Sequence, residues 1–284
     1  EESQALQQFS TPIPLGLAAL CAAAIAPGDR VLEPSAGTGL LAILAETAGG
    51  ALALNELAET RADLLAHLFP DLCVTRFDAA QIDDHLDRAI TPTAVLMNPP
   101  FSAMTNVSGR MADAAYRHVA SALARLADGG RLVAITGANF GPETPAWRDA
   151  FVRFQERGTV VFTAAIDGSV YAKHGTTIET RLTVIDKAPA SHPEQFPASA
   201  GIAPDAATLL TWIAEHVPPR RPIAGLLIAP TAGGVATPRT VRGYLARAAA
   251  RQQTAVIAEP EGVELSYETV EWTPPEGARL TDAL

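Results

Sequence analysis

The chain has 284 residues, of which 48% are apolar, and it carries a formal net charge of −10 at pH 7. This length and apolar content are enough for a full hydrophobic core, so the composition excludes a disordered chain. The acidic balance argues against a protein that holds nucleic acid by its overall charge, because phosphate contacts need clustered Lys and Arg. Any nucleic-acid role therefore needs a local basic patch or a partner domain.

The first residues carry no recognisable targeting signal. The sequence starts "EESQ" without Met, which suggests an excised fragment, and no basic region precedes an apolar stretch as in a signal peptide. Residues 13–28 are apolar but contain Gly16 and are shorter than the roughly 20 residues of a membrane span, so they predict a core helix and no membrane contact. Cys21 and Cys73 have no His or Cys neighbours, which predicts neither disulfides nor a metal site and favours the cytoplasm.

Short β-rich runs alternate with helical patterns as far as residue 187. This alternation predicts an α/β fold with a doubly wound, seven-stranded Rossmann-like sheet and helices on both faces. Crossover helices favour parallel strands. Residues 115–130 have apolar spacing of about 3.6 and a Gly stop, which predicts one of these helices. The expected strands are residues 30–34, 50–56, 73–78, 93–98, 130–137, 159–166 and 181–186.

The composition changes after Lys187, because residues 188–284 hold 12 of the 22 prolines. We therefore expect a domain over 1–187 and a Pro-rich extension over 188–284. The helix expected at 204–217 would pack back on the sheet, with a linker after it. Residues 217–258 contain six arginines and no acid. Their segment 237–254 could follow a phosphate backbone, but a flexible basic linker is the favoured interpretation.

A glycine-rich turn follows the first expected strand in "VLEPSAGTGLLAILA". Gly37 and Gly39 lack side chains there, so backbone N–H groups could approach a ligand. The spacing Gly37-x-Gly39-x-x-Ala42 also satisfies the dinucleotide fingerprint, which keeps NAD open as a cofactor. However, the carboxylate of Glu33 at the strand end would repel a pyrophosphate and attract an ammonium group. This favours S-adenosylmethionine over NAD.

Two further acids end the next two expected strands. Glu56 is placed to accept hydrogen bonds from ribose hydroxyls, and Asp78 could accept one from an adenine amino group. For each of them the simpler interpretation, a helix N-cap or a solvated acid, also stays open.

Five elements occur in a characteristic order: "QQFSTP" (7–12), "LEPSAGTG" (32–39), "NEL" (55–57), "FDA" (77–79) and "NPPF" (98–101). Together they resemble gamma-type N6-adenine DNA methyltransferases over residues 1 to about 187. The resemblance implies S-adenosylmethionine as cofactor, DNA as partner and a flipped adenine base as substrate. It also implies a cofactor site made of Phe9, Thr11 and Pro12 around the methionine part and Glu33, Pro34, Ala36, Gly37, Gly39, Glu56, Asp78 and Asn98 around the rest.

The "NPPF" element carries the expected catalytic residues. The side-chain oxygen of Asn98 and the carbonyl of Pro99 would accept hydrogen bonds from an exocyclic amine and leave its lone pair free for the methyl group. Pro99 and Pro100 would keep the turn rigid, because each fixes φ near about −65°. Phe101 would stack on the base. Alone, the element could be a strand-ending turn, and similar tetrapeptides occur in enzymes that methylate cytosine N4 or protein glutamine.

Weaker candidates lie in "YAKHGTTIETRL" (171–182), where related enzymes place residues of the target-base pocket. Tyr171, His174 and Thr176 are possible lining residues, although a solvated His174 is the favoured interpretation. The whole chain is also similar to the N-terminal methylase-like region of bacterial strawberry-notch-type helicase proteins. That resemblance implies a helicase module after Leu284 and leaves a second hypothesis, a cofactor-binding module with weak or no turnover.

Overall fold

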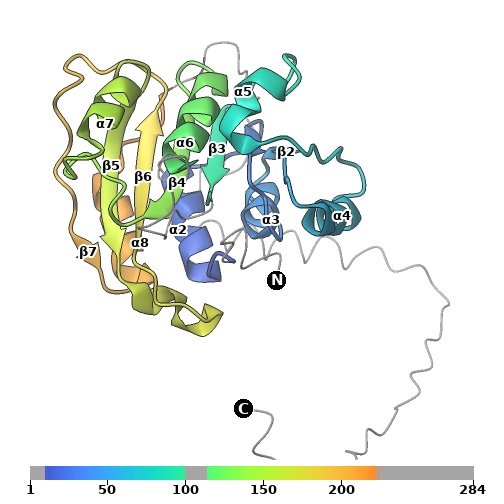
Figure 1. Ribbon diagram of the computed structural model, residues 1–284, viewed down its shortest axis with the longest axis horizontal. Helices are drawn as coiled ribbons and strands as arrows, with labels where there is room; N and C mark the ends of the chain where they lie inside the picture. The colour runs from blue at the N-terminus through green and yellow to red at the C-terminus, as the bar shows by residue number, and fades with distance from the viewer. Residues whose placement is uncertain (1–9, 100–113, 222, 224–284) are drawn as a thin grey trace, which may run out of the picture. The chain divides into compact units, whose positions relative to one another are not determined.

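The computed structural model describes residues 10–99, 114–221 and 223 (Figure 1). The strands are β1 (Arg30–Glu33), β2 (Ala51–Leu54), β3 (Ala94–Met97), β4 (Arg131–Gly137), β5 (Thr159–Ile166), β6 (Thr180–Asp186) and β7 (Ile202–Ala203). The helices are α2 (Ile13–Ala23), α3 (Leu40–Thr47), α4 (Glu59–Leu68), α5 (Ile82–His85), α6 (Ala114–Arg125), α7 (Arg148–Gln155) and α8 (Ala206–His216), with the 3-10 helices η1 (Ala79–Gln81) and η2 (Gly168–His174).

The strands form one seven-stranded sheet in the order β2-β1-β3-β4-β6-β5-β7. Strand β6 runs antiparallel to both β4 and β5, so the expectation of parallel strands does not hold at this position. The reason is the connection: η2 links β5 to β6 without a crossover helix, and a short link of this kind returns the chain antiparallel. The short strand β7, which pairs with β5, was not expected.

Six of the seven expected strands are confirmed, and the one expected at 73–78 is not. Only Thr75 forms an isolated bridge there, to Asn55. The side chain of Asn55 accepts a hydrogen bond from the Phe77 N–H at 2.8 Å and donates one to the Phe77 carbonyl at 2.9 Å. A side-chain amide thus takes the place of a strand ladder beside β2.

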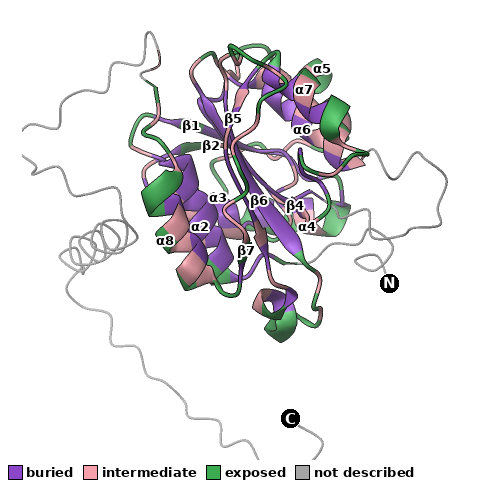
Figure 2. Cartoon of the chain, turned by 90° about the vertical axis from the view of Figure 1, so that its left-hand side faces the viewer, coloured by how far each residue is buried: buried purple, intermediate pink, exposed green. Residues whose placement is uncertain are grey.

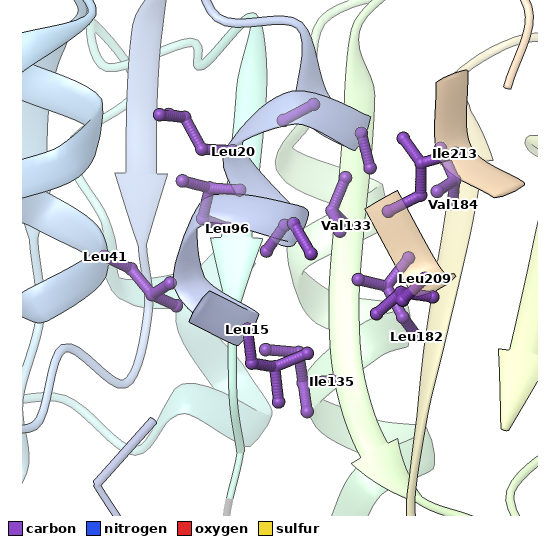
Figure 3. Packing of buried hydrophobic residues seen from close by; sticks show 14 of the residues in the cluster. Leu15, Leu20, Leu41, Leu96, Val133, Ile135, Leu182, Val184, Leu209 and Ile213 are labelled. Atoms are coloured by element: carbon purple, nitrogen blue, oxygen red, sulfur yellow. The ribbon is translucent and has the colours of Figure 1, made fainter. Parts of the chain in front are cut away.

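Helices cover both faces of the sheet, as expected (Figures 1 and 2). Successive residues of β3 are all buried and point alternately to the two faces, Leu96 into one core and Val95 into the other. Leu15 of α2 and Leu209 of α8 pack on the first face with Leu96 (Figure 3). Helices α5, α6 and α7 cover the second face. A central strand buried on both faces explains the continuous apolar run "AVLM".

The expected core helix at 13–28 is α2, although it ends earlier, at Ala23. It packs closely on α3, because a Cβ on Gly16 would lie 2.9 Å from Leu44 Cδ1. The helix expected at 115–130 is α6, and the one at 204–217 is α8, which packs back on α2 and β5 as expected. Among the helices in the described part of the chain, none is long and apolar enough to cross a membrane.

The residues after α8 are held at the edge of the sheet where β1, β3 and β4 begin. Buried Arg131 donates to both carboxylate oxygens of Asp186, at 2.6 and 3.0 Å, and to the Pro218 carbonyl at 2.9 Å. Arg220 donates to Asp29 at 2.7 Å, and both side chains are buried. Arg220 was expected to lie in a linker, but it is a structural residue whose charge is neutralised by this carboxylate.

Candidate active site

A pocket opens at the carboxyl ends of β1, β2 and β3, where ligands bind in open α/β sheets. It encloses about 930 Å³ of space not filled by atoms, part of which is open to solvent. Nine of the expected site residues line it: Thr11, Glu33, Pro34, Ala36, Gly37, Glu56, Asp78, Asn98 and Pro99. Residues from all five sequence elements therefore meet in one place.

Two expected cofactor residues, Pro12 and Gly39, make local backbone and packing contacts. Pro12 precedes α2, and its carbonyl accepts a hydrogen bond from the Gly16 N–H at 2.9 Å. Gly39 precedes α3 with φ of 85°, and a Cβ there would lie 2.8 Å from Leu65 Cδ2, so this glycine permits close packing of α4. Neither residue lines the pocket. The expected residues Phe9, Pro100 and Phe101 and the segment 237–254 lie outside the described residues.

Three N–H groups of the glycine-rich turn are bonded within the protein. The Ala36 N–H donates to the Asn55 carbonyl at 3.0 Å, and the Gly39 N–H donates to the Ala36 carbonyl at 2.8 Å. The Gly37 N–H donates to Glu56 Oε2 at 2.8 Å. A pyrophosphate at Gly37 would meet an N–H group that is already bonded and the Glu56 carboxylate beside it. The geometry therefore argues against a dinucleotide.

Glu56 is oriented by its neighbours. Its Oε1 accepts hydrogen bonds from the Ala58 N–H and from Arg61, both at 2.9 Å, while Oε2 accepts the one from Gly37. The carboxylate is only 3% exposed. Since each carboxylate oxygen offers about two lone pairs, Oε2 can still accept one further hydrogen bond from a ligand hydroxyl.

Glu33 is a buried acid of the pocket. It is 3% exposed, and its Oε2 is buried without a hydrogen-bond partner among the described residues. Burial raises the pKa of Glu33 well above the usual value, the backbone N–H of Ala42 lowers it, and the negative charge of Glu56 raises it further. A buried carboxyl of this kind is stabilised as a carboxylate only when a positive charge comes close. The pocket is thus suited to a cationic ligand.

Asn55, which the sequence analysis did not single out, ties the floor of the pocket together. Its Nδ2 donates to the Pro34 and Phe77 carbonyls, both at 2.9 Å. Its Oδ1 accepts from the Phe77 N–H at 2.8 Å and from Thr75 Oγ1 at 2.9 Å. The side chain is fully buried, so every polar atom of its amide is paired. In the sequence, Asn55 could have been noticed as a polar residue between an apolar strand and Glu56.

The part of the pocket where Asp78 was expected to bind adenine contains a second titratable residue, His118. Asp78 Oδ1 accepts a hydrogen bond from the Ala80 N–H at 2.9 Å, so the N-cap interpretation is confirmed, and the residue also lines the pocket. His118 of α6 lines the same pocket, and its Nδ1 is buried without a partner among the described residues. Burial lowers the pKa of His118, and the charge of Asp78 opposes this. In the sequence, His118 could have been noticed as a polar residue on the apolar face of α6.

Asn98 is held with its amide nitrogen turned toward α2. Nδ2 donates to Thr11 Oγ1 at 2.9 Å, while Oδ1 is buried without a partner among the described residues. The side chain of Tyr171 is fully buried; burial raises its pKa, and the nearby side chain of Asn98 lowers it. His174 is exposed, and neither His174 nor Thr176 lines the pocket. The structure therefore connects one of the three weaker candidates with the expected catalytic residue.

Several solved structures share this fold. The M protein of the type I restriction enzyme EcoKI is 16% identical, with a TM-score of 0.53 over 66% of this chain and 46% of that one. A type I restriction-modification methyltransferase subunit from Streptococcus thermophilus is 17% identical, with a TM-score of 0.54 over 75% and 55%. A candidate class I S-adenosylmethionine-dependent methyltransferase from Listeria monocytogenes is 13% identical, with a TM-score of 0.54 over 75% and 72%.

The chain has the methyltransferase fold. It spans about half the length of the two type I subunits that it resembles. Neither a protein-family model nor a curated protein matches its sequence. At such low identity the shared feature is the sheet with its helices, so the role of each residue has to be argued from the pocket itself.

Proposed function

We propose that this chain is an S-adenosylmethionine-dependent methyltransferase whose substrate is the exocyclic N6 amine of adenine in DNA. The observation that carries the proposal is Asn98, because a buried side-chain acceptor without a partner lies at the pocket that holds Glu33 and Glu56. An unpaired buried acceptor is unfavourable unless a ligand supplies a donor. An amine substrate supplies that donor.

The residues of the pocket fit the proposed cofactor. Glu33 is a buried carboxyl that a cation would ionise, and Glu56 retains an acceptor for a ribose hydroxyl. A Cβ on Gly37 would meet nothing within 4 Å, so the turn leaves open space for a ligand. When bound, S-adenosylmethionine supplies an electrophilic methyl group on a sulfonium.

The chain's own part in the reaction is positioning and electrostatics. An exocyclic amine on a purine is a poor nucleophile, because its lone pair is delocalised into the ring. Asn98 Oδ1 and the Pro99 carbonyl would accept its two N–H groups, which favours a pyramidal nitrogen with its lone pair directed at the methyl group. Phe101, which lies outside the described residues, is proposed to stack on the flipped base.

DNA adenine is favoured over other amines for two reasons. The "NPPF" element follows the F-S-T-P and glycine-rich elements in the order of the gamma-type enzymes. Two structures of the same fold are modification subunits of type I restriction systems. RNA adenine, cytosine N4 and protein glutamine present similar amine or amide groups to the same acceptors and are outcomes of the test below.

The second candidate is a cofactor-binding module of a larger helicase protein, with weak or no turnover. The overall similarity to the methylase-like region of strawberry-notch-type helicase proteins favours it. The intact Asn98-Pro99-Pro100-Phe101 element favours turnover, because a binding module has no need for an amine acceptor.

Mass spectrometry of nucleosides tests the proposal. The protein is incubated with S-adenosylmethionine and, separately, with DNA and RNA, and the nucleosides are then analysed. We expect N6-methyldeoxyadenosine from DNA. Methylation of another atom would replace the substrate assignment, and no methylation despite cofactor binding in calorimetry would favour the binding module. If NAD bound and S-adenosylmethionine did not, the whole methyltransferase proposal would fail.

A further inference from the structure

We propose that His118 of α6 is a specificity residue of the cofactor site, and that its ring donates a hydrogen bond to N1 of the cofactor's adenine. This inference rests on the proposed function, since it names a further contact in the S-adenosylmethionine site. His118 belongs to none of the five sequence elements.

His118 and Asp78 line the pocket from two elements that pack on each other. His118 is on α6, Asp78 is the N-cap of η1, and α6 packs directly on η1. Phe77 and Ala79, on either side of Asp78, line the pocket as well. Both backbone groups of Phe77 are bonded to the Asn55 side chain, at 2.8 and 2.9 Å. This wall of the pocket is therefore held in place before a ligand binds.

His118 occupies a position of α6 that would normally carry an apolar side chain. Ala115, Val119 and Ala122 of this helix face the core, and residues three or four positions apart lie on the same side of a helix. Nδ1 of His118 is buried and has no partner among the described residues. A buried polar atom without a partner is unfavourable, and a ligand in the pocket would supply one. The torsion that joins the ring to Cβ is broad, so the ring can turn Nδ1 from the wall toward the pocket.

The charge state of His118 suits a purine nitrogen. Burial lowers the pKa of His118, and the charge of Asp78 opposes this. The ring is therefore neutral at pH 7, with one nitrogen as donor and the other as acceptor. Adenine offers two neighbouring groups on one edge, the N6 amine as donor and N1 as acceptor. Asp78 can only accept, and its Oδ1 already bonds the Ala80 N–H at 2.9 Å, which leaves Oδ2 for the amine. N1 then needs a donor, and the neutral ring of His118 has one.

Calorimetry with two probes tests the contact. One probe is S-adenosylhomocysteine, and the other is its 1-deaza analogue, in which a C–H group replaces N1 and the amine is kept. We expect the wild type to bind the 1-deaza probe about 3- to 10-fold more weakly, the range set by one net hydrogen bond. His118→Phe keeps an aromatic ring without nitrogens, so it should bind both probes equally, with the affinity of the wild type for the 1-deaza probe. The matched control is His216→Phe, because His216 is exposed at the end of α8 and does not line the pocket.

A second measurement observes the ring itself and does not require His118→Phe to fold. The chain contains six histidines, so protein labelled with ¹⁵N only at histidine gives six pairs of ring nitrogens. His118→Asn, which keeps a polar side chain at this position, assigns the His118 pair. We expect S-adenosylhomocysteine to shift this pair, because a bond to N1 fixes one tautomer, and the 1-deaza probe to shift it much less.

The outcomes separate the two proposals. If the wild type binds both probes equally, or if His118→Phe keeps the wild-type preference for S-adenosylhomocysteine, the contact with N1 is wrong and the proposed function stands. If the ring nitrogens of His118 shift alike with both probes, the contact is wrong as well. If neither S-adenosylmethionine nor S-adenosylhomocysteine binds the wild type, the proposed function fails and the contact with it.

Discussion

Replacing Asn55 by Ala should destabilise the domain and disrupt the cofactor pocket together. The side chain joins three segments that the backbone alone does not join: the residue after β1, the end of β2, and residues 75–77. Because the pocket is lined by Pro34 and Phe77 as well as Asn55, removing the amide releases two of its walls at once.

The expected magnitude follows from the four hydrogen bonds of the amide, at 2.8 to 2.9 Å. A hydrogen bond of this type contributes about 1 kcal/mol net, and a buried backbone group left unpaired costs somewhat more. Asn55→Ala should therefore lower the free energy of unfolding by about 3 to 4 kcal/mol. For a domain of this size that is a fall in melting temperature of about 6 to 15 °C.

Thermal denaturation with and without S-adenosylmethionine measures both effects. Asn139→Ala is the matched control, since Asn139 is exposed and its side chain makes no hydrogen bond to another described residue. We expect Asn55→Ala to lose the stabilisation by ligand that the wild type and the control retain. A melting temperature within about 2 °C of the wild type would refute the assignment of Asn55 as the tie between these segments.

Three further variants test single features. Burial raises the pKa of Glu33, so ionising this carboxyl lowers the stability of the apoprotein once the pH exceeds the unfolded pKa, and most once it exceeds the folded pKa. Glu33→Gln should therefore raise the melting temperature at pH 8 but not at pH 4. It should also weaken S-adenosylmethionine binding in calorimetry. The pKa of His118 is lowered, so here it is protonation that destabilises the fold, and stability should be lost as the pH falls below about 6.5. His118→Phe should reduce that loss in the same melting series. Gly39→Ala should cost about 1 to 3 kcal/mol in urea denaturation, because φ is 85° and the new Cβ would meet Leu65.

Much of the fold was predictable, since buried strands read as short apolar runs and the helices between them carry clear stop signals. The exceptions have local causes. Strand β7 has two residues, too few for any pattern, and the reversal of β6 depends on a link that forms a 3-10 helix instead of a crossover. The segment at 73–78 has strand composition, but it is bonded to a side chain and not to a full ladder.

The site was predictable where a chemical group follows a strand, as with Glu33, Glu56 and Asn98, because parallel strands bring their carboxyl ends to one edge. The site was not predictable where the role of a residue depends on its contacts with segments that are distant in the sequence. Asn55 matters for its bonds to two distant carbonyls, and His118 matters for the residues that α6 faces. The spacing of glycines did not show that the N–H groups of Ala36, Gly37 and Gly39 are bonded within the protein, the one of Gly37 to Glu56.

The most direct test of the central claim is methyl transfer by Asn98→Ala. Wild type and variant are incubated with S-adenosylmethionine labelled on its methyl group and with DNA, while calorimetry monitors cofactor binding and Asn139→Ala serves as control. Loss of the acceptor for the amine should lower the rate by about 100-fold or more, as the loss of one preorganised transition-state contact does. Methyl incorporation at the wild-type rate by Asn98→Ala would contradict the account.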